Sequence, residues 1–118
     1  MPQNYPSFKQ WKGEEANEAL KIMWEVSNGD KDFILTMGAE NGEFTPYRLH
    51  PKRNKDGSWD YSFGLNSYYH KDMIARIKAK TVSVKEIIEY TYKVYQKRHG
   101  AFYGYNVRSK TYKIINFQ

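Results

Sequence analysis

The 118-residue sequence predicts an α+β fold that is predominantly helical and carries one small β-hairpin. Several segments place apolar side chains at the i, i+3, i+4 spacing of an amphipathic helix. A turn-rich stretch over residues 45–62, with Pro46, Pro51 and Gly57, can form the hairpin. No repeat or change of composition divides the chain. We therefore expect an N-terminal arm over residues 1–13 and a single domain over residues 14–118, long enough for one core.

The first half of the chain predicts two helices after an irregular arm. Pro2 and Pro6 disfavour regular structure in the arm. A helix begins near Glu14 and is stopped by Asn28-Gly29. Asp30 is a capping residue for the next helix, which ends at Asn41-Gly42. The inward-facing positions of the two helices are Ala16, Ala19, Leu20, Met23 and Trp24, then Phe33, Ile34 and Met37.

The second half predicts a short helix around Met73–Ile77 and a longer one that opens at Ser83. The run Ser83-Val84-Lys85-Glu86 fits a capping box, and His99-Gly100 ends this helix. We expect a bend or short helix at residues 103–106. Residues 111–117 form a short terminal segment, and the sequence does not decide between helix and strand there. The buried face of the longer helix is Val84, Ile87, Ile88, Thr91 and Tyr95.

Composition limits the possible partners and cofactors. The net charge of +6 favours polyanions, either cell-wall polymers or nucleic acids. The chain has no cysteine, no apolar signal segment at its start and no run long enough to span a membrane, so we expect synthesis in the cytoplasm. Its three histidines share no metal-ligand spacing and no phosphate-binding loop occurs, so we expect neither metal nor cofactor.

Two carboxyls are the candidate catalytic groups. Glu40 lies three positions after Met37, beside the buried stripe of its helix, where partial burial would raise its pKa. Asp60 lies on the polar hairpin and would stay charged. Glycoside cleavage needs this division between acid and carboxylate. The alternatives are that Glu40 is a solvated helix-end residue, that Glu43 is the acid, and that Asp60 only bonds its own turn.

The same stretch resembles the active-site region of the lysozyme superfamily. The runs that carry the resemblance are Glu40-Asn41-Gly42-Glu43-Phe44-Thr45-Pro46, Arg53-Asn54-Lys55-Asp56-Gly57-Ser58-Trp59-Asp60-Tyr61 and Gly64-Leu65-Asn66-Ser67. Tyr103-Gly104-Tyr105-Asn106 is similar to the Tyr-Asn motif of the soluble lytic transglycosylase branch. The likeness extends over roughly residues 30–107. It implies a lysozyme-like fold with the hairpin beside the active-site cleft.

The resemblance implies cleavage of the β-1,4 bond between N-acetylmuramic acid and N-acetylglucosamine in peptidoglycan, with Glu40 as general acid. Asp60 is then nucleophile or charge stabiliser, although the transglycosylase branch uses the glutamate alone. The expected substrate contacts are Trp59, Tyr61, Asn66, Ser67, Tyr105 and Asn106. The lack of cysteine points to a bacterial or phage relative, monomeric, reaching the wall after lysis or on a virion.

A second interpretation is a non-catalytic module that is rich in basic and aromatic residues. Aromatic side chains make up 17% of the sequence and can stack on sugar rings or bases. Such a module would bind cell-wall glycan or nucleic acid without cleaving either. The sequence leaves this alternative open, as it does the choice between hydrolysis and transglycosylation.

Overall fold

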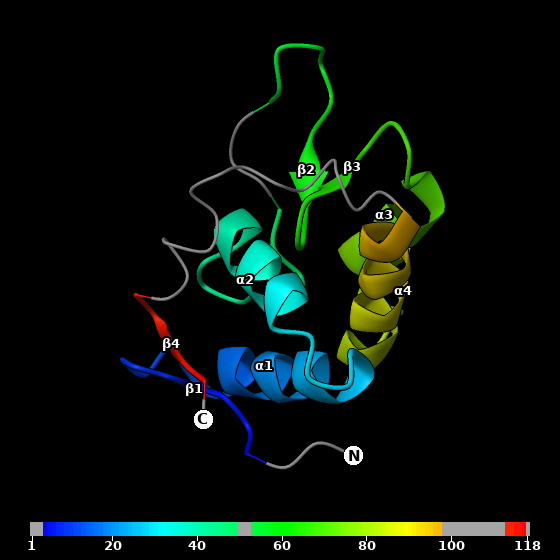
Figure 1. The fold of residues 1–118 in the computed structure, drawn as a ribbon. Coiled ribbons are helices and arrows are strands. Elements are labelled where there is room, and N and C mark those ends of the chain that lie inside the picture. Colours follow the sequence, from blue (N-terminus) through cyan, green and yellow to red (C-terminus); the bar gives the residue numbers. More distant parts are fainter. Residues whose placement is uncertain (1–3, 50–52, 98–112, 118) are drawn as a thin grey trace.

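Four helices and two small antiparallel sheets make up residues 4–49, 53–97 and 113–117, the part of the chain that the computed structural model describes (Figure 1). The chain is an α+β globule, mostly helical, as predicted. The helices are α1 (Glu14–Val26), α2 (Lys31–Glu40), α3 (Lys71–Ala79) and α4 (Val84–Lys97). Strand β1 (Ser7–Phe8) pairs with β4 (Ile115–Asn116), and β2 (Asp60–Tyr61) pairs with β3 (Leu65–Asn66).

The two predicted helix caps are confirmed. The carboxylate of Asp30 accepts a hydrogen bond from the backbone N–H of Phe33 at 3.0 Å, which opens α2. At α4, Ser83 Oγ accepts from the N–H of Glu86 at 3.1 Å. The carboxylate of Glu86 accepts in return from the N–H of Ser83 at 3.4 Å. Side-chain caps therefore fix where these two helices begin.

Two apolar clusters hold the elements together. The larger one gathers α1, α2 and α4 around side chains such as Leu20, Phe33 and Ile88, none of which is exposed. The smaller one joins the β2–β3 hairpin to α3 and the start of α4 through Tyr61, Leu65 and Ile77. The hairpin is thus anchored on an apolar base while its polar tip, residues 54–58, extends from the body (Figure 1).

The N-terminal arm is not wholly irregular, and the expectation for residues 7 and 8 was wrong. Ser7 pairs with Asn116 and Phe8 with Ile115. The ring of Phe8 packs edge-on against Phe44, with centroids 5.1 Å apart. Pro6 sits just before this strand, where its missing N–H breaks no hydrogen bond of the pair. Packing between the two ends of the described chain decided this pairing.

No helix in the described ranges has both the length and the apolar character needed to cross a lipid bilayer. The predicted helix end at His99-Gly100 and the bend at residues 103–106 lie outside the described residues. The lysozyme-like assignment of the fold stays a prediction.

Candidate active site

Glu40 and Asp60, the two predicted catalytic carboxyls, line the same cavity. Glu40 is the last residue of α2 and Asp60 the first residue of β2. The cavity has a volume of about 230 Å³ and is called here the carboxylate cavity; its lining residues are Ala39, Glu40, Arg48, Asp60, Ser62 and Gly64. Tertiary structure therefore brings a helix end and a hairpin strand to one polar site.

A buried asparagine joins the two sides of this cavity. Asn41 has no exposed surface, and its side-chain amide donates to the carbonyl oxygen of Thr45 at 2.9 Å and to that of Ser62 at 3.1 Å. The backbone N–H of Ser62 in turn donates to the carbonyl of Arg48 at 2.8 Å. Because Asn41 and Ser62 are buried, the hydrogen bond between them sets the distance between the end of α2 and the segment after β2.

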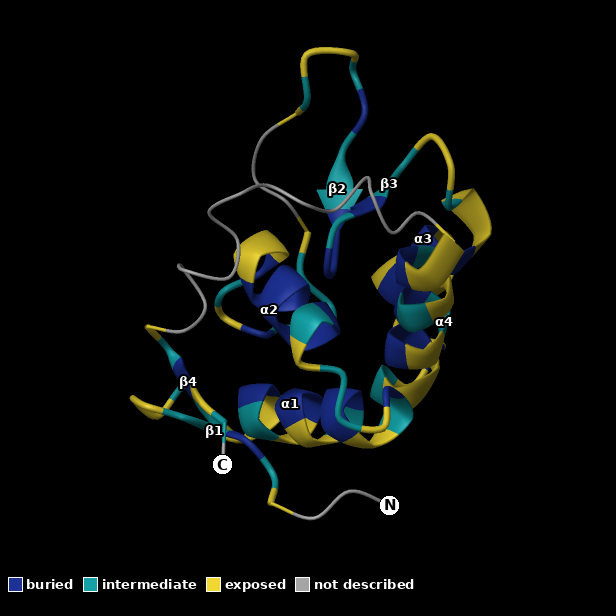
Figure 2. Cartoon of the chain, viewed as in Figure 1, coloured by how far each residue is buried: buried dark blue, intermediate teal, exposed yellow. Residues whose placement is uncertain are grey.

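Glu40 is exposed, whereas its spacing from Met37 predicted partial burial. Residues 33–38 of α2 are buried, but Ala39 and Glu40 are exposed, a change that Figure 2 shows at the end of the helix. The prediction that the core margin would shelter this carboxyl was therefore wrong. The reason is geometric, because the last turn of α2 extends beyond the apolar cluster that covers Met37.

Gly64 leaves room for the Glu40 side chain. Its φ of +87° lies in a region that other residues rarely adopt. A Cβ on Gly64 would lie 2.8 Å from Glu40 Oε2 and 3.0 Å from Glu40 Cδ. The glutamate carboxylate thus lies directly over the backbone of the hairpin turn, so a side chain at this position would require the carboxylate to shift.

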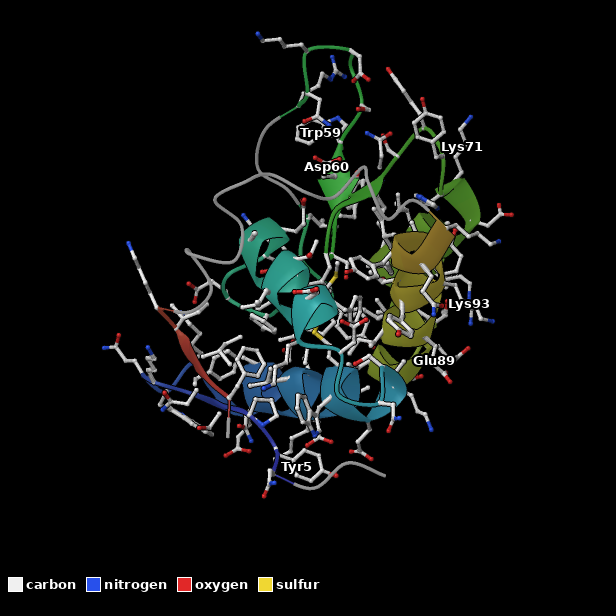
Figure 3. All side chains as sticks on the ribbon, in the orientation of Figure 1. Tyr5, Trp59, Asp60, Lys71, Glu89 and Lys93 are labelled. Carbon is white, nitrogen blue, oxygen red and sulfur yellow. The ribbon has the colours of Figure 1, made fainter. Side chains whose placement is uncertain are left out.

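The carboxylate of Asp60 belongs to a hydrogen-bonded hairpin network. Asn66 Nδ2 donates to Asp60 Oδ1 at 3.4 Å and to Ser58 Oγ at 2.9 Å. Ser58 is fully buried, and its hydroxyl donates to Asp56 Oδ1 at 2.6 Å. This hydrogen bond and the one from the N–H of Ser58 lower the pKa of Asp56. The network holds Asp60 at a fixed place on the strand, on the hairpin where Figure 3 labels it.

The predicted substrate contacts divide into several groups. Tyr61 is 8% exposed and belongs to the smaller apolar cluster, so its ring is a core element. Trp59 is partly buried, with the guanidinium of Arg53 5.9 Å from its ring centroid. Ser67 Oγ accepts a hydrogen bond from the N–H of Trp59 at 2.8 Å, and Asn66 Oδ1 accepts from the N–H of Tyr68 at 2.9 Å.

Asn66 and Ser67 therefore use polar atoms to shape the hairpin. The other two predicted contacts, Tyr105 and Asn106, lie outside the described residues.

Sequence reasoning missed four lining residues of the cavity as site residues: Ala39, Arg48, Ser62 and Gly64. Gly64 was noted only as part of a motif, and Arg48 lies in the turn-rich stretch where no periodicity indicates a direction. Ser62 follows Asp60 by two positions, but it lies after the end of β2 with a φ of +55°, so the alternation of strand faces gives no signal for it.

A second cavity lies beyond the hairpin, at the start of α3. It has a volume of about 580 Å³; its lining includes Tyr68, Tyr69, His70, Lys71, Arg76 and Tyr90. Tyr68 is 49% and Tyr69 69% exposed. Tyr90 OH lies 2.6 Å from His70 Nδ1, and burial, followed by the charge of Asp72, raises the pKa of Tyr90. Exposed rings beside cations suit a sugar or another flat ligand.

Across the described ranges, no three His, Asp or Glu side chains come together as a metal site would require. The chemistry available in the carboxylate cavity is that of two carboxyls, a guanidinium and a hydroxyl. No protein-family model, curated protein or solved structure matches the chain.

Proposed function

We propose that the protein is a peptidoglycan-cleaving glycosidase, a muramidase or a lytic transglycosylase, with Glu40 as its general acid. The observation that supports this most directly is that Glu40 and Asp60 line one cavity. Two carboxyls at a shared site are the minimum that most glycoside hydrolases use. The lysozyme-like sequence motifs around both residues point to a wall glycan as the substrate.

In the proposed reaction, Glu40 donates its proton to the oxygen that bridges the two sugars. The bond from that oxygen to the anomeric carbon breaks, and positive charge develops on the ring of N-acetylmuramic acid. Asp60, or the acetamido group of the substrate, stabilises this charge. Attack by water completes hydrolysis, whereas attack by the 6-hydroxyl of the same sugar gives an anhydro product.

Proton donation from an exposed glutamate requires help from the substrate. A glycan strand bound over the end of α2 would displace water from Glu40, and loss of water disfavours the charged carboxylate. The hairpin supplies the other wall, since Gly64 lies directly against the glutamate. In this proposal, binding of the glycan removes water from Glu40, which the apolar core does not do.

Arg48 gives the cavity a positive charge beside its two carboxyls. A guanidinium is a good partner for a carboxylate in two-pronged geometry. N-acetylmuramic acid carries a carboxylate on its lactyl group, whereas N-acetylglucosamine is neutral. We assign Arg48 to recognition of the acidic sugar, which would make muramic-acid polymers better substrates than chitin.

The test compares Glu40→Gln with Glu43→Gln on purified cell walls. Glu43 is the right control because it lies only three residues away, is exposed and pairs with Lys12 at 3.5 Å. We expect Glu40→Gln to lose at least about a hundredfold of the clearing rate and Glu43→Gln to keep it. Equal clearing by wild type and Glu40→Gln would remove Glu40 from the mechanism. Mass spectrometry separates the two reactions, because anhydro ends lack one water.

The alternative is a non-catalytic module that binds glycan or nucleic acid. The cavity with exposed Tyr68 and Tyr69 beside Lys71 favours it, because stacking rings and a cation bind without any acid. It predicts wall or DNA binding that weakens steeply with salt, with no sugar released. Release of soluble muropeptides by wild type would exclude it.

A further inference from the structure

Ser62 combines two features that lower stability. Its φ is +55°, in the left-handed region that a side chain with a Cβ enters at a cost. The residue is only 3% exposed, and its buried hydroxyl has no hydrogen-bond partner in the described structure. A buried hydroxyl without a partner is uncommon and unfavourable. Glycine at this position would avoid both costs.

The surroundings show that the hydroxyl is not needed to hold the local fold. The N–H of Ser62 donates to the carbonyl of Arg48, and its own carbonyl accepts from Asn41. The backbone is thus fully engaged without the side chain. Ser58, a buried serine on the same hairpin, is the opposite case, because its Oγ donates to Asp56 and accepts from Asn54 and Asn66.

Ser62 also lies in the lining of the carboxylate cavity with Glu40 and Asp60. Unsatisfied or strained groups that the rest of the structure maintains are concentrated at functional sites. A serine hydroxyl can both donate and accept, and rotation about one bond redirects it among staggered positions. Where it lies, the hydroxyl oxygen is closed to water, so rotation about the Cα–Cβ bond has to turn it toward the cavity before a bound ligand becomes its partner.

We propose that Ser62 is a positioning residue whose hydroxyl holds the attacking O–H group of the cleavage reaction. This inference rests on the proposed function. The O–H belongs either to water or to the 6-hydroxyl of the substrate sugar, and both offer the same hydrogen-bonding chemistry. Its oxygen forms the new bond to the anomeric carbon after the bond from that carbon to the leaving oxygen has broken. The proton from Glu40 goes to the leaving oxygen. The proton of the attacking group passes to a cavity carboxylate, Asp60 or the deprotonated Glu40.

The experiment measures stability and steady-state kinetics in Ser62→Ala, Ser62→Gly and Ser58→Ala. We expect both Ser62 variants to be at least as stable to heat as wild type, while kcat falls about tenfold or more and KM changes less than twofold. Ser58→Ala, which breaks a satisfied network, should lower the unfolding temperature. Products analysed by mass spectrometry in ¹⁸O-water assign the attacking group: label incorporated at the new reducing end indicates water, and unlabelled anhydro ends indicate the sugar hydroxyl.

Two results would overturn the assignment of Ser62. One is a kcat within twofold of wild type in both Ser62 variants while wild type cleaves wall glycan. The other is a loss of stability in Ser62→Ala as large as that in Ser58→Ala, since it would show that the hydroxyl serves the fold. If wild type neither cleaves nor binds wall glycan, the proposed function fails, and the role of Ser62 with it.

Discussion

The side-chain amide of Asn41 donates to the carbonyl oxygen of Ser62 at 3.1 Å, so one buried residue connects the end of α2 with the segment after β2. Glu40 directly precedes Asn41, and Asp60 lies two residues before Ser62. The relative position of the two carboxyls thus depends on a hydrogen bond between their near neighbours.

Replacing Asn41 with alanine should lower the free energy of unfolding by about 2 kcal/mol, because the carbonyls of Thr45 and Ser62 lose a buried donor. Urea denaturation measures the change. We expect wall clearing to fall as well, because Glu40 loses its connection to the hairpin. Asn17→Ala on α1 is the control. The Asn17 side chain makes no hydrogen bond in the part of the chain described, so the free energy of unfolding of Asn17→Ala should not fall. A neutral Asn41→Ala would contradict the role given to this residue.

Gly64→Ala should reduce both stability and activity. The new Cβ would lie 2.8 Å from Glu40 Oε2, and the φ of +87° is strained for alanine. We expect a loss of on the order of 1–3 kcal/mol in the free energy of unfolding, together with a displaced carboxylate and a lower clearing rate. Gly13→Ala tests the strain alone, since Gly13 has a φ of +108° and open space around it. If Gly13→Ala lost as much activity as Gly64→Ala, displacement of Glu40 would not be the cause.

Arg48→Gln should weaken binding of acidic wall fragments and leave binding of neutral chitin oligomers unchanged. The variant loses a charged hydrogen bond to the substrate. If that bond contributes about 1.4 kcal/mol to binding, KM rises about tenfold. Kinetics on both substrates measure the ratio. Arg53→Gln is matched in charge but removes a guanidinium that lies over Trp59 and does not line the cavity. An equal effect of both variants would reduce the role of Arg48 to general electrostatic attraction.

Stability should decline in acid as two hydrogen-bonded carboxyls become protonated. Hydrogen bonds from Ser58 lower the pKa of Asp56 below its usual 3.8, and Arg76 and Ser83 lower that of Glu86 below 4.5. A lowered folded-state pKa contributes stability above the usual value, and this is lost as pH falls through the folded pKa. The contribution of these two groups is therefore present above pH 4.5 and decreases below it.

Denaturation with urea at pH values from 6 to about 3 measures how the free energy of unfolding changes with pH. This is the range in which acid unfolding occurs. The double variant Asp56→Asn, Glu86→Gln should flatten this pH dependence relative to wild type. Glu89→Gln is the control because Glu89 lies exposed on α4, where Figure 3 labels it, and its side chain makes no hydrogen bond within the described ranges. A flattening of the same size in Glu89→Gln would contradict the assignment.

The sequence by itself determined the local structure of this protein. Apolar spacing placed the helices, and short-range side-chain bonds at Asp30 and at Ser83 with Glu86 fixed two of their starts, because such signals lie within a few residues of one another. It also selected Glu40 and Asp60 as a pair, and both line the same cavity.

Tertiary structure alone decided which side chains those elements bring together. It paired residues 7–8 with residues 115–116, buried Tyr61, exposed Glu40, and left the hydroxyl of Ser62 without a partner among the described residues. These outcomes depend on how far α2 extends past the core and on where the hairpin turns back. Packing between segments that are distant in the sequence decides both. Periodicity reports which face of an element is apolar, but not the distance at which two elements meet.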